Sequence, residues 1–132
     1  MHHPAHPLRI FILEGYEPAR RGLQEQLERN GFDVVGTASS AREAAALVLS
    51  LHPDVAVLVV RLQDGNGLDV LRAVHSADPS VRCLMLDTVS DDDAMRSARA
   101  EGASGYLLKQ IDGAALRDAL HRAAAGEFLF AA

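Results

Sequence analysis

The chain has 132 residues, which is the length of one domain, and 48% of them are hydrophobic, enough to cover a sheet on both faces. Its formal net charge is -5, and because an acidic surface repels nucleic acid we expect no DNA binding by this segment itself. The single cysteine, Cys83, cannot form an internal disulfide, so we expect a reducing, cytoplasmic location. Since no stretch reaches the ~18 apolar residues that span a bilayer, we expect no membrane association.

Strand-like and helix-like segments alternate from residue 8 to residue 126. Short apolar runs indicate buried strands, and apolar residues spaced at i, i+3 and i+4 indicate helices. The expected strands are 8–13, 33–38, 54–60, 81–86 and 104–108. The expected helices run from Pro18 to Asn30, over 41–51, over 68–77, from Asp91 to about Glu101, and from Asp112 to Ala125.

Polar residues mark the beginnings of three of these helices. Ser40 and Glu43 have the spacing of a capping box before the second helix. Ser90 is the expected cap of the fourth helix, and Asp112 that of the fifth. The loop 61–67 contains the residues DGNG, which indicate turns without regular structure.

Five strand–helix pairs with short links predict a parallel sheet. At this length we expect a flavodoxin-like α/β fold, a doubly wound (βα)5 sheet with strand order 2-1-3-4-5 and a cleft at the carboxyl ends of its strands. We divide the chain into an N-terminal arm (1–7), one domain (8–126) and a C-terminal tail (127–132). The residues expected around the cleft are Glu14, Gly15, Val59, Val60, Arg61, Asp87, Thr88, Lys109 and Gln110.

Three stretches, in the right order on the expected elements, carry a family resemblance. They are PARRGL after the first strand, PDVAVLVVRLQDGNGLDVL across the third, and EGASGYLLK into the fifth. With them the chain resembles the receiver domains of two-component response regulators, closest to the NarL/LuxR class and, within it, to the DevR or DosR dormancy regulators. The resemblance implies a signalling function, and a helix-turn-helix DNA-binding domain after the receiver. One interpretation of the tail is that it begins the linker to such a domain.

The family's phosphorylation chemistry depends on five positions. They are an acidic pair that helps to hold Mg²⁺, an aspartate that accepts the phosphoryl group, a Thr or Ser, a Lys, and an aromatic residue that often changes rotamer on activation. Here these positions are Glu14-Gly15, Val59, Asp87, Lys109 and Tyr106. Val59 has no nucleophile and one carboxylate of the pair is missing. The resemblance therefore implies a degenerate phosphorylation site with weak or absent Mg²⁺ binding and no cofactor.

Several questions about this site stay open at the level of sequence. Asp87 and Lys109 can form an internal ion pair that imitates the contact between phosphate and Lys, or Asp87 can be a solvated carboxylate. Tyr106 is either a rotamer switch or an ordinary strand aromatic. Asp54 and Asp64 are alternative phosphoryl acceptors, although neither lies where neutralising groups are expected.

The sequence thus predicts an atypical receiver domain, a signalling and dimerisation module of a transcription regulator that works without aspartyl phosphorylation. We expect a homodimer through outer helix faces, either the first and fifth helices or the fourth helix with the fifth strand and helix. An alternative is a receiver-like domain that senses a small ligand or an anion. No Ser/His/Asp arrangement, metal cluster or nucleophile elbow is present in the sequence, so we expect no enzymatic activity.

Overall fold

Five parallel strands form the central sheet, in the order β2-β1-β3-β6-β7. They are β1 (Arg9–Leu13), β2 (Asp33–Ala38), β3 (Val55–Val59), β6 (Arg82–Asp87) and β7 (Gly105–Leu108). The computed structural model describes residues 7–130, so the expected arm lies outside the described residues apart from Pro7. Counted without the short hairpin strands β4 and β5, the order is 2-1-3-4-5, which confirms the flavodoxin-like prediction.

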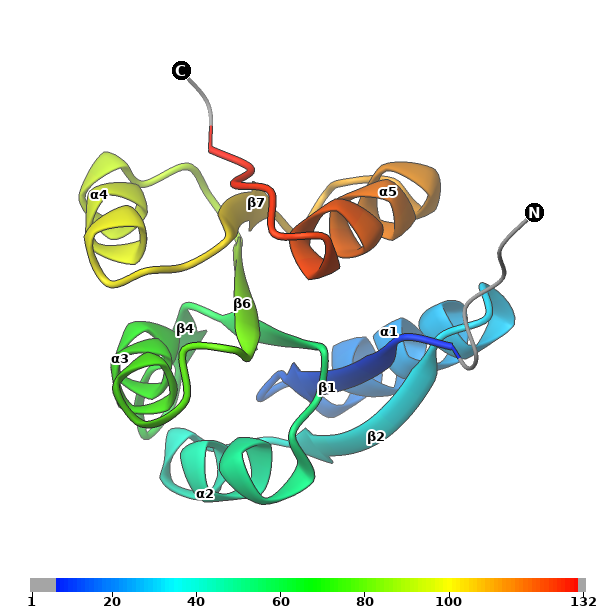
Figure 1. Cartoon of the computed structure of the whole chain (residues 1–132), viewed down its shortest axis with the longest axis horizontal. Coiled ribbons are helices and arrows are strands. Elements are labelled where there is room, and N and C mark those ends of the chain that lie inside the picture. The colour runs from blue at the N-terminus through cyan, green and yellow to red at the C-terminus, as the bar shows by residue number, and fades with distance from the viewer. Residues whose placement is uncertain (1–6, 131–132) are drawn as a thin grey trace.

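Helices cover both faces of this sheet (Figure 1). They are α1 (Glu17–Arg29), α2 (Ala41–Leu51), α3 (Gly67–Ala77), α4 (Asp92–Ala100) and α5 (Gly113–Ala124). Helices α1 and α5 pack on one face, and α2, α3 and α4 pack on the other. None of the helices within residues 7–130 combines the length and the apolar character needed to cross a membrane.

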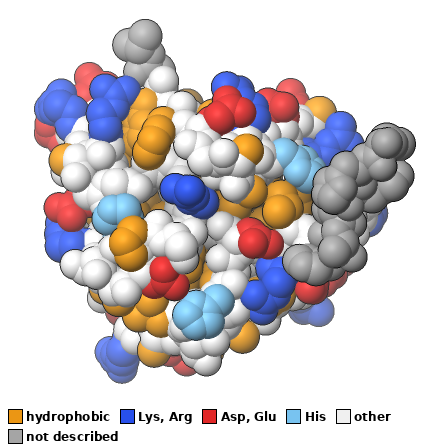
Figure 2. Space-filling view, viewed as in Figure 1, with side chains coloured by type: hydrophobic (Ala, Val, Ile, Leu, Met, Phe, Trp, Pro, Cys, Tyr) orange, Lys and Arg blue, Asp and Glu red, His pale blue; other side chains and the backbone are white. Residues whose placement is uncertain are grey.

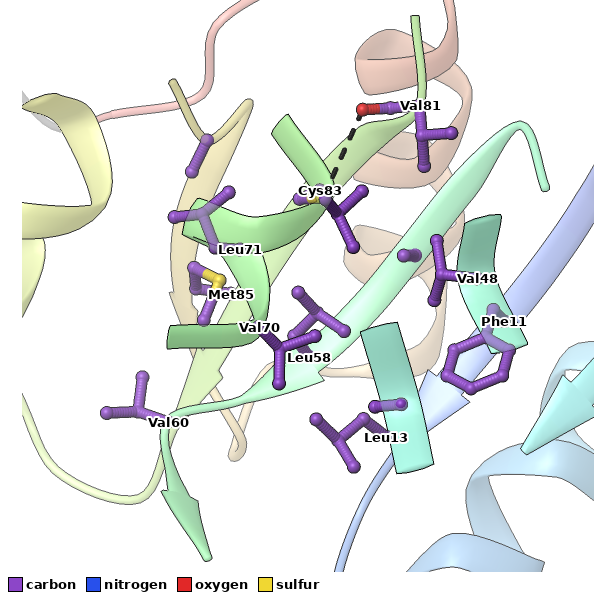
Figure 3. Packing of buried hydrophobic residues seen from close by; sticks show 14 of the residues in the cluster. Phe11, Leu13, Val48, Leu58, Val60, Val70, Leu71, Val81, Cys83 and Met85 are labelled. Carbon is purple, nitrogen blue, oxygen red and sulfur yellow. Dashed lines mark hydrogen bonds between the residues drawn. The ribbon is translucent and has the colours of Figure 1, made fainter. Parts of the chain in front are cut away.

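The two helix layers create two apolar clusters, one on each face of the sheet. Figure 3 shows the cluster under α2, α3 and α4, where Leu58, Leu71 and Met85 are fully buried. Successive residues of β3 point alternately into this cluster and into the one under α1 and α5. This explains why the sequence of β3 is a continuous apolar run rather than an alternating one. Burial of each such Leu or Val side chain stabilises the fold by roughly 1.5–3 kcal/mol.

The loop after β3 is more ordered than the sequence indicates. Residues Arg61–Leu62 (β4) and Gly65–Asn66 (β5) pair as a two-stranded antiparallel hairpin, so the prediction of turns alone was wrong. Asn66 then caps α3, since its side chain accepts a hydrogen bond of 2.7 Å from the backbone N–H of Leu68. The hairpin therefore leads directly from the carboxyl end of β3 into the next helix.

The cap of α2 comes from this hairpin rather than from Ser40. The Asp64 carboxylate accepts hydrogen bonds from the N–H groups of Ala41 at 2.9 Å and Arg42 at 3.1 Å. These backbone hydrogen bonds hold the pKa of Asp64 below its usual value. Ser40 bonds the Glu43 side chain instead of the helix backbone, so the predicted capping box is wrong as a backbone cap. A residue 23 positions away in the sequence takes its place.

Of the two other caps, one was wrong and one is confirmed. The cap of α4 is Asp91 rather than Ser90, and its carboxylate accepts from the N–H groups of Asp93 and Ala94. The cap of α5 is Asp112, as the sequence predicts. Its carboxylate accepts from the Ala115 N–H at 2.8 Å.

Replacement of Gly67 by Ala is expected to destabilise the fold. A Cβ at this position would lie 1.9 Å from the carbonyl oxygen of Val59, and neither backbone can yield without moving β3 or α3. We expect Gly67→Ala to lower the free energy of unfolding by about 1–3 kcal/mol, measured by urea denaturation. Gly22→Ala is the matched control, because a Cβ there meets nothing within 4 Å. In the middle of α1 it should stabilise by about 0.5–1 kcal/mol. Equal effects of the two variants would contradict the close approach at Gly67.

Candidate functional site

The carboxyl edge of the sheet collects the residues that the sequence singles out. Glu14 follows β1, Val59 ends β3, Asp87 ends β6 and Lys109 follows β7. Because these strands are parallel neighbours, their ends meet at one edge of the sheet. The register aligns Val59 with Leu86 across β3 and β6. The four residues therefore lie at one edge of the sheet, whereas their mutual contacts differ from the prediction.

Lys109 forms its ion pair with Glu14. The Lys109 Nζ donates to Oε1 of Glu14, and the other oxygen of this carboxylate accepts from the N–H of Tyr16 at 3.0 Å. The Glu14 residue is only 4% exposed, so its charge needs a partner inside the fold. Both of its oxygens are therefore occupied by protein donors.

Asp87 is buried and paired with Arg61, so both possibilities raised by the sequence, an ion pair with Lys109 and a solvated carboxylate, are wrong. The Asp87 carboxylate is fully buried and accepts hydrogen bonds from Arg61 Nε at 3.1 Å and from the Thr88 N–H at 2.9 Å. The contact of Lys109 with Asp87 is a backbone one, in which its N–H donates to the Asp87 carbonyl at 2.8 Å. The hairpin brings the Arg61 guanidinium over the end of β6, and Arg suits a buried carboxylate because its donors are many and fixed in direction.

Arg61 also ties this carboxylate to the beginning of α4. Its Nη2 donates to the Asp91 carboxylate at 3.1 Å. The hydrogen bond with Asp91, followed by the charge of Asp87, raises the pKa of Arg61 above its ordinary value. The backbone N–H of Ala94, followed by Arg61, lowers the pKa of Asp91. The sequence places Arg61 near the cleft but does not reveal this bridging role, which depends on the hairpin.

Tyr106 points its hydroxyl at the same carboxylate. The hydroxyl donates to Asp87 Oδ2 at 2.5 Å and accepts from the Asp91 N–H at 3.1 Å. Burial of the side chain and the hydrogen bond to Asp87 raise the pKa of Tyr106 to about 12. Tyr106 is thus more than a strand aromatic in an apolar environment, because it supplies the third donor to Asp87. Whether it also changes rotamer stays a prediction.

Val59 offers no polar group to this edge. It is 3% exposed and packs in the apolar cluster under α1 and α5. Its side chain is a hydrocarbon, so the end of β3 presents neither a nucleophile nor an oxygen ligand. The remaining carboxylates, Glu14 and Asp87, already hold protein cations. This donor set fits Mg²⁺ poorly, because a divalent cation would have to displace Lys109 or Arg61.

A cavity of about 320 Å³ opens beside these groups. Its lining residues are Glu14, Gly15, Tyr16, Arg61, Leu62, Gln63 and Lys109. Within residues 7–130 no group of three or more His, Cys, Asp or Glu side chains is arranged to hold a metal ion. The chemistry of this edge is therefore that of linked ion pairs, in which Lys109 holds Glu14 and Arg61 holds Asp87 and Asp91, and both cations line the cavity.

Comparison with known proteins agrees with this architecture. The sequence profile of the response regulator receiver domain matches residues 10–121. The DNA-binding transcriptional activator DevR/DosR of Mycobacterium tuberculosis is 44% identical over 123 residues, which cover 92% of this chain and 57% of that protein. The nitrate/nitrite response regulator protein NarL of Escherichia coli is 31% identical over 124 residues, or 93% of this chain and 57% of that protein.

A solved structure shows the same fold. The two-component response regulator of the LuxR family from Aurantimonas sp. SI85-9A1 superposes with a TM-score of 0.87 at 29% identity, covering 93% of this chain and 89% of that one. The chain spans little more than half the length of the two curated relatives, 57% in each case. The match over the domain, the strand order and the similarity to NarL and LuxR proteins lead to one conclusion. The chain belongs to the response regulator receiver domain family, in its NarL/LuxR class.

Proposed function

We propose that this chain is an atypical receiver domain that regulates transcription without aspartyl phosphorylation. The observation that carries the proposal is the buried Asp87 carboxylate, which is neutralised by Arg61 and held by Tyr106. In the family the corresponding position holds a Thr or Ser that bonds an incoming phosphate. In this chain the position is Asp87, a carboxylate that is already paired with the Arg61 guanidinium.

The missing phosphoryl acceptor supports the same proposal. Phosphoryl transfer needs an in-line nucleophile and groups that neutralise the transferred oxygens. Val59 supplies no nucleophile, and the cations Lys109 and Arg61 are engaged by Glu14 and Asp87. Mg²⁺ binding is accordingly weak or absent, and the domain needs no cofactor.

The contacts of two other acids argue against a non-standard phosphorylation site. Asp54 lies at the amino end of β3, where its Oδ2 accepts from the N–H of Arg9 at 2.8 Å. Asp64 caps α2 with both of its oxygens. Transfer to either would remove a backbone contact without a neutralising cation in place.

The domain acts as a signalling and dimerisation module rather than as an enzyme, in the cytoplasm. The name of the 44% identical relative, a DNA-binding transcriptional activator, supports a role in transcription. Since this relative is longer than the chain, a helix-turn-helix domain fused to the receiver is the partner that the class implies, and the receiver itself does not bind DNA. We assign the N-terminal arm to 1–7, the receiver to 8–126 and the tail to 127–132. A homodimer forms through the outer face of α1 and α5, because residues 127–130 already cover part of the edge beside α4.

The cavity beside Arg61 and Lys109 favours a second candidate, a receiver that senses an anion. Both cations line the cavity, and the Arg61 side chain is 52% exposed. An anion would have to compete with Glu14 and Asp87 for these charges. For that reason we rank this function second.

Treatment with a phosphodonor tests the proposed function directly. Incubation with Mg²⁺ and acetyl phosphate should add no phosphoryl mass to the intact protein, because no acceptor with neutralising groups is available. A receiver with the complete aspartate site serves as the positive control. A stoichiometric mass gain would overturn the proposal. A rise in melting temperature with inorganic phosphate, without any mass gain, would favour the anion-sensing candidate instead.

The contact between Tyr106 and Asp87 can be tested by titration of the tyrosine. The chain has two tyrosines, so in a Tyr16→Phe background the phenolate absorbance reports on Tyr106 alone. We expect its pKa at about 12, and a lower value when Asp87→Asn removes the neighbouring charge, although burial, the larger cause of the shift, remains. Because the folded-state pKa of Tyr106 lies above the unfolded one, its ionisation disfavours the folded state, so this contribution to the free energy of unfolding is complete below about pH 10 and is lost as the pH rises to about 12. An identical titration in the Asp87→Asn variant would contradict the contact.

Self-association can be tested in solution. Sedimentation velocity should show a dimer whose population does not change with a phosphodonor, since the resting ion pairs replace the phosphate. A charge reversal on the outer face of α1, such as Arg21→Glu, should weaken the dimer. The same reversal on α4, Arg96→Glu, is the matched control and should not. A monomer at all concentrations up to ~100 μM, where interfaces of moderate size associate, would contradict dimerisation.

A further inference from the structure

The segment after α5 folds back onto the edge of the sheet. The chain turns at Gly126, whose φ of +94° is in the left-handed region that favours glycine. Residues 127–130 then run along β7, between α4 and α5 (Figure 1). The Leu129 N–H donates to the Ser104 carbonyl at 2.6 Å, and Leu129 pairs with Gly105 in a parallel bridge. The tail thus covers backbone groups that an edge strand would otherwise leave open.

Two consecutive side chains anchor this segment on opposite faces of the sheet. Leu129 packs against the cluster under α1 and α5, whereas Phe130 packs against the cluster under α2, α3 and α4. The guanidinium of Arg99 in α4 lies 4.9 Å from the centroid of the Phe130 ring, in the geometry of a cation–π contact. Phe128 is 68% exposed and makes no comparable anchor. In Figure 2, hydrophobic side chains show at the surface between α4 and this end of the chain.

The tail approaches the backbone of the sheet closely at Gly105. A Cβ at residue 105 would lie 2.9 Å from the Cβ of Leu129 and 3.0 Å from its carbonyl oxygen, and also 2.9 Å from Cδ1 of Leu84 in β6. Glycine at this position is therefore what allows the tail to approach so closely. The backbone bond, the two apolar anchors, the cation–π contact and Gly105 together distinguish this segment from a loosely attached end.

We propose that Leu129 and Phe130 form a latch, whose docking site is the edge of β7 and whose docking depends on the contact between Tyr106 and Asp87. Tyr106 directly follows Gly105 in β7, and its ring packs against the same apolar cluster as Phe130. The Tyr106 hydroxyl contacts Asp87, the Asp91 N–H and the Val89 carbonyl, and the short bond to Asp87 is the one with a charged partner. Loss of that bond weakens the hold on the ring and loosens the strand to which the latch is bonded. The inference rests on the proposed function in one respect, which is that the contact between Asp87 and Tyr106 is the resting state of the site.

The latch gives the domain a means of output. The two curated relatives are longer than the part of them that matches this chain. Where a domain follows a receiver, a docked latch fixes the point at which that domain leaves the receiver, and an undocked latch releases it. The state of the buried carboxylate is thereby communicated to that domain without a change in the helices.

Hydrogen exchange of the amide at position 129 tests the docking, in the full chain and without a phosphodonor. Leu129→Ser should increase its exchange rate at least about 10-fold, because one of the two anchors is lost. Phe128→Ser, the matched control, removes a larger apolar side chain that is exposed, and should leave the rate unchanged. Rates are compared with those of β3 amides, which report on global unfolding. An unchanged rate in Leu129→Ser, or equal increases in both variants, would overturn the latch.

Tyr106→Phe tests the dependence on the Tyr106 hydroxyl, because it removes the contacts with Asp87, the Asp91 N–H and the Val89 carbonyl and keeps the ring. We expect exchange at position 129 to become about 5- to 10-fold faster while the β3 amides keep their rates. Reciprocally, Leu129→Ser should shift the ring resonances of Tyr106, as linkage requires. An unchanged rate at position 129 in Tyr106→Phe would overturn the coupling. Since no phosphoryl donor is present, this result is independent of whether the domain is phosphorylated.

Discussion

One buried carboxylate constrains the functional edge of this receiver. Asp87 has no solvent access for its side chain, and an unpaired charge in such a position is too costly to persist. Three donors satisfy it, and they come from the hairpin after β3, from its own neighbour Thr88 and from β7. The positions of Arg61, Tyr106 and the beginning of α4 are consequently linked to one another.

The parallel sheet makes this arrangement possible. Glu14, Asp87 and Lys109 are separated by long stretches of sequence, yet the fold brings the ends of their strands to one edge. Three carboxylates, Glu14, Asp87 and Asp91, face the two cations Lys109 and Arg61 there, so every charge at this edge has a partner within the fold. In the proposed function these ion pairs take over the role that phosphate and metal have in other receivers, and the domain rests in one state without them.

The edge strand β7 joins the carboxylate to the surface. One of its residues, Tyr106, holds Asp87, and its neighbour Gly105 carries the tail. Both contacts depend on the same short strand, which has a sheet neighbour on one side only. If the latch depends on Tyr106, a change at the Asp87 carboxylate alters the docking of Leu129 and Phe130 before it affects the well-packed interior.

The sequence by itself determined the fold class, the strand order and the location of the cleft, because apolar periodicity and chain order suffice for a parallel α/β sheet. It also determined that Val59 brings no nucleophile, which follows from the side chain alone. The tertiary structure decided which residues contact each other. Asp87 forms its ion pair with Arg61 rather than with Lys109, and the backbone at the beginning of α2 is capped by Asp64 rather than by Ser40. These contacts depend on the hairpin at 61–66, whose short strands carry too weak a pattern to be predicted. These contacts depend on distances between side chains that folding brings together, and such distances cannot be inferred from the local sequence.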